Sequence, residues 1–328
     1  MKSIKGMTLV ELMISVTLGV IVVGASLQVF LTFKQVYMTQ QGLARIQENA
    51  RILNMILGEV IQASGNIGCN AFREDISFYV PPHIDSIHFG LERTQRIRGI
   101  SIEALKSDPI SYRLLSKRIS PDSDILWVKT IKKNRSLIHP ASFLDAVLWI
   151  KGPPKLYKNQ ILCLSDCSHA DFIKVYEDVN RGDRYSSVPI KIFPGALSKQ
   201  YGQGASIGVL SSTFFYVGKT NRNNQNGYPV MALYSTDLNG RTLELIEGVE
   251  HFEVRYGVKV KEKIIYFAHH QVSSWQEVVS VRILALLNSI EDGLKAPKFY
   301  QFRDKNVMPS DRLIRMWWAF EWTIKGIM

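Results

Sequence analysis

A single uncharged stretch near the start of the chain most constrains its architecture. Leu12 to Phe33 holds 22 residues without a charge, and Glu11 comes directly before it. As a helix rising 1.5 Å per residue, the stretch measures roughly 33 Å, enough to cross a bilayer core of about 30 Å. A secretory signal peptide has an apolar region of about 7–15 residues followed by a small-residue cleavage site, which is missing here. The stretch therefore predicts a membrane-spanning helix that stays on the protein.

The residues before the span set its predicted direction. Lys2 and Lys5 precede it, and the positive-inside rule places such residues in the cytoplasm. Everything after Phe33 is then exported. A carboxylate costs on the order of 2.5–3.5 kcal/mol at the centre of a membrane helix and less near the interface, so Glu11 calls for a function.

A processing signal overlaps the start of the span. The segment Lys5-Gly6-Met7-Thr8-Leu9-Val10-Glu11 resembles the type III signal sequences of type IV pilins and pseudopilins. In that family a prepilin peptidase cuts after the glycine, on the cytoplasmic side, and methylates the new N-terminus. The resemblance implies a cut between Gly6 and Met7, N-methylation of Met7, and Glu11 as the acid at mature position five. The family usually has Phe where this chain has Met7.

The resemblance gives Glu11 a role in assembly that has a physical basis. In a growing filament the N-terminal amine of one subunit lies in apolar surroundings, where an unpaired charge is costly. A carboxylate from a neighbouring subunit neutralises this amine and fixes the axial register. Removing one partner of such a buried pair typically costs about 3–5 kcal/mol. The alternative is a glutamate that merely extends to the membrane interface.

The helical pattern continues beyond the span. An apolar stripe with alternating spacings of three and four residues consists of Leu43, Ile46, Ala50, Leu53, Leu57 and Val60. No proline interrupts residues 7–64, and Ser64-Gly65-Asn66 is a typical helix stop. We predict one long helix, with residues 7–33 in the membrane and 34–64 packed on a globular head. A coiled-coil stalk is the weaker alternative, because the stripe has fewer than three full heptads.

Residues 65–328 are predicted to form a β-rich head. Segments with the alternation and composition of strands are 211–218, 229–235, 249–258, 277–287 and 312–325. Asn239-Gly240 is a turn dipeptide that makes a hairpin of the second segment and the residues that follow it. In the third segment, alternation places Val249 on the face of His251 and opposite Phe252. The region from Arg93 to Arg135 is polar and basic, and we expect long loops there.

Several blocks of the head resemble the PilW family of minor type IV pilins. They are Asp166–Phe172, Phe215–Gly218, Leu233-Tyr234, Glu244–Glu250, Val254–Gly257 and Val281–Ile283. Each block alone is ordinary strand chemistry, and their order along the chain gives the resemblance its weight. It implies an α+β, pilin-like fold: a long N-terminal helix packed on an antiparallel sheet that is enlarged by additional β structure.

Three cysteines lie in the exported part of the chain. An oxidising periplasm favours one disulfide and leaves one thiol over. Cys69 with Cys167 is the first choice, because this pair would hold the end of the helix on the head, and Cys163 with Cys167 is the alternative. A third interpretation is metal binding by Cys163, Cys167 and His169, but no second Cys/His pair follows at the spacing of zinc sites.

The chain is basic, with 40 Lys and Arg against 29 Asp and Glu and a net charge of +11. Its densest basic runs are Arg93–Arg98 and Lys129–Arg135. Basic surfaces attract phosphate without regard to sequence, and related filaments bind DNA, so DNA is a compatible partner. Neither run has a nucleic-acid motif or interleaved stacking aromatics. This favours a solvated surface or a contact to acidic neighbouring subunits.

No pattern in the sequence predicts catalysis. Asp166-Cys167-Ser168-His169 places an acid, a thiol, a hydroxyl and an imidazole side by side, but catalytic groups meet through folding and no oxyanion-hole motif accompanies them. The chain has neither a Walker loop nor a G-x-G-x-x-G motif, so it is not the ATPase of an assembly machine. We expect no enzyme, no cofactor and no metal site.

The resemblance implies a minor type IV pilin, held in the bacterial inner membrane by one span with its head in the periplasm and later carried to the pilus and cell surface. Its implied partners are prepilin peptidase, the inner-membrane assembly platform, other minor pilins, the major pilin and a large tip adhesin. Its task would be to prime pilus assembly at the filament tip, and so to serve adhesion and twitching motility. Two alternatives remain: a J-type minor pseudopilin of a type II secretion system, and a membrane-tethered periplasmic binding protein.

Overall fold

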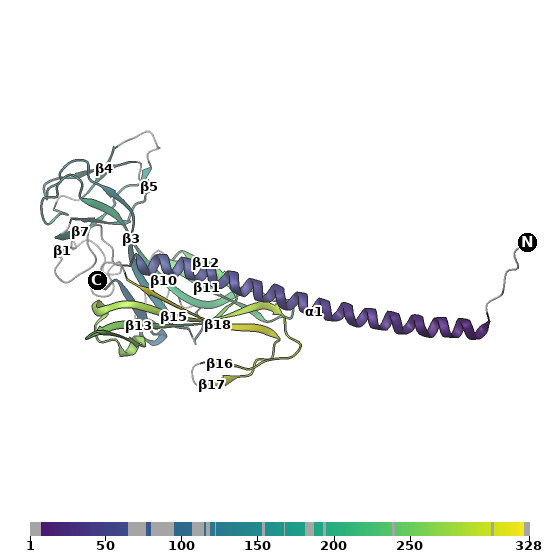
Figure 1. Cartoon of the computed structure of the whole chain (residues 1–328). Helices are drawn as coiled ribbons and strands as arrows, with labels where there is room; N and C mark the ends of the chain where they lie inside the picture. The colour runs from purple at the N-terminus through teal and green to yellow at the C-terminus, as the bar shows by residue number, and fades with distance from the viewer. Residues whose placement is uncertain are drawn as a thin grey trace, which may run out of the picture.

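The structure is a computed structural model with one very long helix and a β-rich head (Figure 1). It describes residues 8–64, 77–79, 95–106, 115, 119–121, 123–152, 155–166, 168–180, 187–192, 195–237, 240–302 and 305–324. The helices are α1 (Leu9–Gln62) and α2 (Ile102–Lys106), with the 3-10 turns η2 (His269–Gln271) and η3 (Trp275–Glu277). The strands are β1 (Ser77–Tyr79), β2 (Ile97–Ile100), β3 (Ile125–Ser136), β4 (Val147–Lys151), β5 (Lys155–Leu156), β6 (Ile161–Ser165), β7 (His169–Lys174), β8 (Val179–Asn180), β9 (Ser187–Lys191), β10 (Ser206–Asn223), β11 (Pro229–Asp237), β12 (Thr242–Glu247), β13 (Val249–Val260), β14 (Lys263–Phe267), β15 (Val278–Asp292), β16 (Tyr300–Phe302), β17 (Lys305–Val307) and β18 (Leu313–Thr323).

Helix α1 confirms the predicted long helix and divides into two parts. Thr8 is its N-cap, and the cap at Ala63 ends it within two residues of the predicted stop. Every described residue up to Lys34 is exposed, and this part includes an apolar window of mean hydropathy 2.2. From Gln35 onwards the helix lies on the head. Figure 1 shows the first part as a bare rod that leaves the head at one end.

Two sheets form the body of the head. The larger has eight strands, with β1-β7-β6-β10-β11-β12 as its main path and β3 and β2 continuing from β10. The smaller is wholly antiparallel in the order β14-β13-β15-β18. The predicted strands at 211–218, 229–235 and 249–258 fall within β10, β11 and β13, and those at 277–287 and 312–325 overlap β15 and β18. Strand β11 pairs with β12 as predicted. The α+β pilin-like class is therefore confirmed.

The main core lies between α1 and the inner faces of both sheets. The helix contributes a fully buried row, and this row is Ile46, Ala50, Leu53, Leu57 and Ile61. Two glycines let strands approach the helix closely. A Cβ at Gly42 would lie 2.9 Å from the Ser289 side chain, and one at Gly58 would lie 2.6 Å from Trp322 Nε1. The same Trp322 nitrogen donates a hydrogen bond of 3.2 Å to Asn54.

A second lobe of the head has a core of its own. The long strands β3 and β10 run from the main core into this lobe, where β10 pairs with β6 and where β4 with β9 and β5 with β8 form small antiparallel ladders. Its buried residues include Leu148, Ile150, Leu164, Ile190 and Tyr201. Figure 1 shows the lobe at the end of the head opposite to the bare part of α1.

The structure corrects two expectations from the sequence. Gly248 adopts φ +77° and the register between β13 and β15 shifts between residues 249 and 251, so Val249 joins Phe252 in the core instead of facing the same way as His251. The basic region from Arg93 to Arg135 contains β2, α2 and all of β3 except its last residue, Ser136. Burial on both faces of β3 explains why it lacks a simple strand alternation.

The packing of α1 yields a direct test. Leu53 is fully buried, whereas Met55 on the same helix is 65% exposed. Leu53→Ala should lower the free energy of unfolding by about 2–5 kcal/mol because it leaves a cavity between two sheets. Met55→Ala should change it by less than about 0.5 kcal/mol. Denaturant unfolding of the full chain in detergent checks this, and equal effects of the two substitutions would contradict the packing.

Candidate functional site

The start of α1 brings Glu11 into contact with Thr8. The Thr8 amide and hydroxyl each donate to Glu11 Oε2 at 3.1 Å, and the Glu11 amide donates to Thr8 Oγ1 at 3.3 Å. This reciprocal capping box satisfies orphan donors of the first helical turn. In the single chain the Glu11 carboxylate thus binds the residue that follows Met7. Gly6 and Met7 themselves lie outside the described residues.

The bare half of α1 is the largest apolar surface in the described chain. Its side chains are exposed by half or more at nearly every apolar position, for example 75% at Leu9 and 63% at Phe30. A soluble monomer rarely exposes a contiguous apolar surface of this extent, which marks a membrane or protein contact. Lipid or the apolar faces of other helices would cover it.

Of the three cysteines, the structure describes Cys163. Cys163 is a free, fully buried thiol on β6, between Phe172 of β7 and Gly208 of β10 in the sheet. Burial and, to a lesser degree, the Asp171 carboxylate raise the pKa of this thiol. Cys69 and Cys167 lie outside the described residues, so the predicted pair remains a prediction. A free Cys163 leaves that pair as the one to test first.

The acid, hydroxyl and imidazole near Cys167 form a turn between β6 and β7. Asp166 Oδ1 accepts from the Ser168 amide and hydroxyl and from the His169 amide at 2.9–3.0 Å, and Lys199 Nζ lies 2.5 Å from Asp166 Oδ2. Partial burial raises the pKa of Asp166, but these donors outweigh it and hold the pKa below its usual range. The carboxylate is thus fully engaged in shaping the turn.

Asp171 joins strand β7 of the second lobe to Ser198 by hydrogen bonds. It is fully buried on β7 and accepts from the Ser198 amide at 2.6 Å and the Ser198 hydroxyl at 2.8 Å. Burial raises its pKa, and the two bonds from Ser198 only partly oppose the effect. Within the described residues, no group of three or more His, Cys, Asp or Glu side chains is placed to hold a metal ion.

Each basic run contains one cation that is buried inside the head. Arg96 is 3% exposed and donates through one guanidinium nitrogen to the Gln276 carbonyl at 2.8 Å. Lys129 is 1% exposed, with its ammonium 4.5 Å from the centre of the Trp127 ring. Burial lowers the pKa of Lys129 to about 7. These two cations therefore cannot contact a nucleic acid from the surface, although Lys132 on β3 is exposed.

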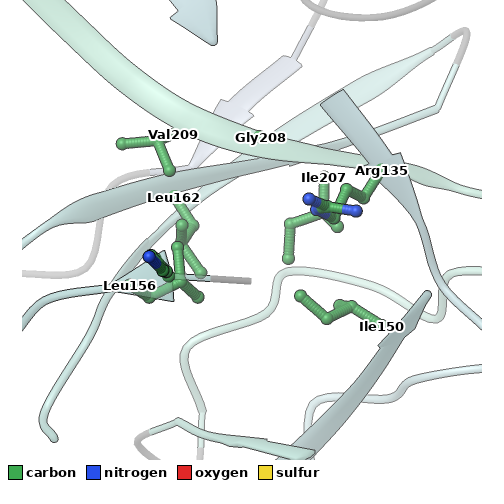
Figure 2. A pocket seen from close by; sticks show the side chains of 8 residues that line it. Arg135, Ile150, Leu156, Leu162, Ile207, Gly208 and Val209 are labelled. Atoms are coloured by element: carbon green, nitrogen blue, oxygen red, sulfur yellow. The ribbon is translucent and has the colours of Figure 1, made fainter. Parts of the chain in front are cut away.

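The second lobe contains a small apolar pocket (Figure 2). Its cavity volume is about 20 Å³, and its lining includes Ile150, Leu156, Leu162, Ile207 and Arg135. This is far below the range of about 300–1,000 Å³ typical of ligand sites. Among its described lining residues there is no carboxylate, imidazole, hydroxyl or thiol side chain. The pocket has the chemistry of a packing gap.

Two segments of the chain match models of known protein families. Residues 214–325, from the second half of β10 to the end of β18, match the model of the family described as Type IV Pilus-assembly protein W. Residues 1–27 match the Prokaryotic N-terminal methylation motif, which covers Gly6, Met7 and Glu11. No curated protein and no solved structure is similar enough to count as a match. Both resemblances seen in the sequence are thus confirmed.

The state of the cysteines can be read by alkylation. In the native protein the Cys163 thiol should react at least about a hundredfold more slowly than an exposed thiol, because it is buried and its pKa is raised. If Cys69 and Cys167 form a disulfide, the alkylating reagent should label one cysteine in protein denatured without reductant. It should label all three cysteines in protein denatured with reductant. Cys163→Ala is the matched control and should abolish the first label. A disulfide-linked peptide that contains Cys163 would contradict the assignment.

Burial of Lys129 predicts a pH dependence of stability. Its pKa is about 7 in the folded protein and about 10.4 in an unfolded chain, so the unfolded state binds more protons between these values and stability rises with pH across them. Lys129→Met should remove this rise and stabilise the protein by about 2–4 kcal/mol at pH 6, with a smaller gain towards pH 10. The contact with Trp127 favours the charged form and limits the gain.

The exposed Lys132, three residues along the same strand, supplies the control for that experiment. Lys132→Met should leave the slope of unfolding free energy against pH unchanged. If Lys129→Met shows the wild-type slope as well, the Lys129 ammonium keeps an ordinary pKa in the folded protein, and the proposed effect of burial is wrong.

Proposed function

We propose that this chain is a minor pilin that joins other minor pilins to prime pilus assembly. The matches of residues 214–325 to the pilus-assembly family and of residues 1–27 to the methylation motif support the proposal. The complex would form in the inner membrane and remain at the filament tip as the major pilin polymerises beneath it. In this proposal the protein works by binding its neighbours and catalyses no reaction.

The observation that carries the proposal is the division of α1 into a bare and a packed half. The packed half fixes the direction of the helix relative to the head through a fully buried row of side chains. The bare half, about 39 Å long from Leu9 to Lys34 at 1.5 Å per residue, makes no contact with the described head. A rigid apolar rod on a folded head can reside in a bilayer or in a bundle of like helices, because lipid tails and helix faces are similarly apolar.

Glu11 is the proposed docking residue of this rod. Processing after Gly6 would create the amine of Met7 one residue before Thr8, whose amide and hydroxyl Glu11 already binds. In the filament, the carboxylate would exchange these local partners for the methylated amine of a neighbouring subunit. The exchange would replace neutral partners by a charged one and pair the carboxylate with the amine, which favours one axial register over others.

The proposed partners follow from this arrangement. Prepilin peptidase would process the cytoplasmic end, the inner-membrane platform would gather the minor pilins, and the major pilin would continue the helix bundle. The second lobe at the far end of the head is the part best placed to meet a large tip adhesin (Figure 1).

Glu11→Ala tests the proposal in the native host. The variant should be processed like the wild type, since the cleavage position is intact, but surface pili should fall to the level of a strain lacking the gene. Processing is read by a mobility shift on immunoblots and piliation by shearing and electron microscopy. Full piliation with Glu11→Ala would remove the docking role.

Two variants separate this result from general damage to the helix. Glu48→Ala removes an exposed acid that pairs with Arg51 at 2.9 Å on the same helix, and it should leave piliation unchanged. Gly6→Leu should accumulate as an uncut precursor because the peptidase site is blocked. Normal processing of Gly6→Leu would overturn the cleavage assignment and leave a membrane-tethered binding protein as the better account.

A further inference from the structure

The loop between β15 and β16 lies at the end of the head from which α1 emerges (Figure 1). The Gly293 carbonyl at its start accepts hydrogen bonds from Gln35 Nε2 at 2.9 Å and from Thr39 Oγ1 at 2.7 Å. Gln35 is only two residues beyond Phe33, the last residue of the uncharged span. Along the helix axis Gln35 is about 3 Å beyond Phe33, and Thr39, six residues beyond it, is about 9 Å away. The Gly293 carbonyl lies between these two levels.

This short distance sets the height of the loop above a membrane. The polar headgroup region adds roughly 5–8 Å on each side of the hydrocarbon core. When Leu12–Phe33 spans the core, the Gly293 carbonyl therefore lies at the level of the headgroups. The head has no room to stand clear of the bilayer at this end.

The start of the loop is also held firmly. The amides of Gly293 and Leu294 both donate to the Arg312 carbonyl at 3.0 Å, and the Arg312 guanidinium pairs with Asp292 at 2.8 Å. A Cβ at Gly293 would lie 2.6 Å from Ile314, so the loop packs tightly on β18. The loop thus keeps its position relative to the helix while the protein is in the membrane.

The side chains of the loop match an anionic membrane surface. Lys295 and Lys298 are exposed and form no ion pair within the described part of the chain, and Phe299 beside them is 63% exposed. Nearby Met308 is 68% exposed. Lysine with aromatic and other apolar side chains is the composition that favours the membrane interface, where the cation meets lipid phosphate and the ring enters the acyl boundary.

The acidic groups at this end of the head are already engaged. Asp292 pairs with Arg312, Asp311 pairs with Arg315 at 2.7 Å, and Glu291 accepts the Gln225 amide at 3.1 Å. Only Asp292 has an arginine to itself: Asp311 shares Arg315 with Glu250, and Glu291 keeps its charge because an amide donor is neutral. Lys34, on the first turn of α1 beyond the span, adds a further exposed cation at the same height.

We propose that Gly293–Phe299 is a membrane-docking loop that binds anionic phospholipid and holds the head against the bilayer before assembly. The inference rests on the proposed membrane anchor and adds a second, electrostatic attachment to it. Entry into a filament would then require this contact to break, so lipid charge would influence how readily the subunit leaves the membrane.

Photo-crosslinking of the full chain in vesicles tests the loop. Phe299 is replaced by p-benzoyl-L-phenylalanine, and the protein is reconstituted in phosphatidylcholine with or without phosphatidylglycerol. Two matched positions use the same probe in place of phenylalanines of similar exposure, Phe30 in the span at 63% and Phe143 in the second lobe at 55%. Lipid adducts are identified by mass spectrometry.

The expected pattern differs at each position. The probe at residue 30 should give lipid adducts in both vesicles, the probe at 143 in neither, and the probe at 299 mainly where phosphatidylglycerol is present. Lys295→Gln and Lys298→Gln should each lower the yield at 299 by about fivefold in anionic vesicles. Lys261→Gln, at an exposed lysine of the β13–β14 turn, should leave that yield unchanged.

Two results would overturn the proposal in distinguishable ways. Lipid adducts at residue 30 with none at 299, or protein-to-protein adducts at 299 in their place, would leave the anchor intact and remove the docking loop. Absence of lipid adducts at residue 30 would remove the membrane anchor itself, and the proposed function with it.

Discussion

The packing of the second half of α1 between two sheets is the contact on which the rest of the molecule depends. Ile46, Leu53, Leu57 and Ile61 are fully buried there, and each buried side chain of this size contributes about 1.5–3 kcal/mol. The same contact holds the larger sheet against the smaller one and fixes the direction of the helix. Its register puts Gly42 under Ser289 and Gly58 under Trp322, so the bare half begins at a defined point.

The exposed N-terminal half of α1 must be covered by something other than the head. Its side chains are apolar all round and find no partner in the described head, which suits a bilayer and a bundle of pilin helices equally well. Movement between these two environments changes apolar burial little. The energetic difference must then come from the few polar groups, with Glu11 at one end of the rod and the lysines of the docking loop at the other.

The sequence predicted this helix well because each half has a clear local pattern, a long uncharged run in the first and a regular apolar stripe in the second. The strands β10, β11, β13, β15 and β18 were found for the same reason. Val249 was placed on the wrong face because a bulge beside Gly248 shifts the alternation by one residue, and such a bulge has no reliable signature in one sequence. The buried Lys129 and Arg96 were counted as surface charge, since composition cannot tell whether a lysine lies over Trp127 or faces water. The strand order of the second lobe could not be predicted, because β4 pairs with β9 and β6 with β10 across long stretches of chain, and only β6 and β7 pair as neighbours in sequence.

We propose that the helix is an assembly element processed at its cytoplasmic end, and the first measurement to make is the intact mass of the protein from the membranes of its own host. The mass should be lowered by Met1–Gly6 and raised by one methyl group. A full-length, unmethylated mass would contradict it and would reduce the helix to a plain membrane anchor.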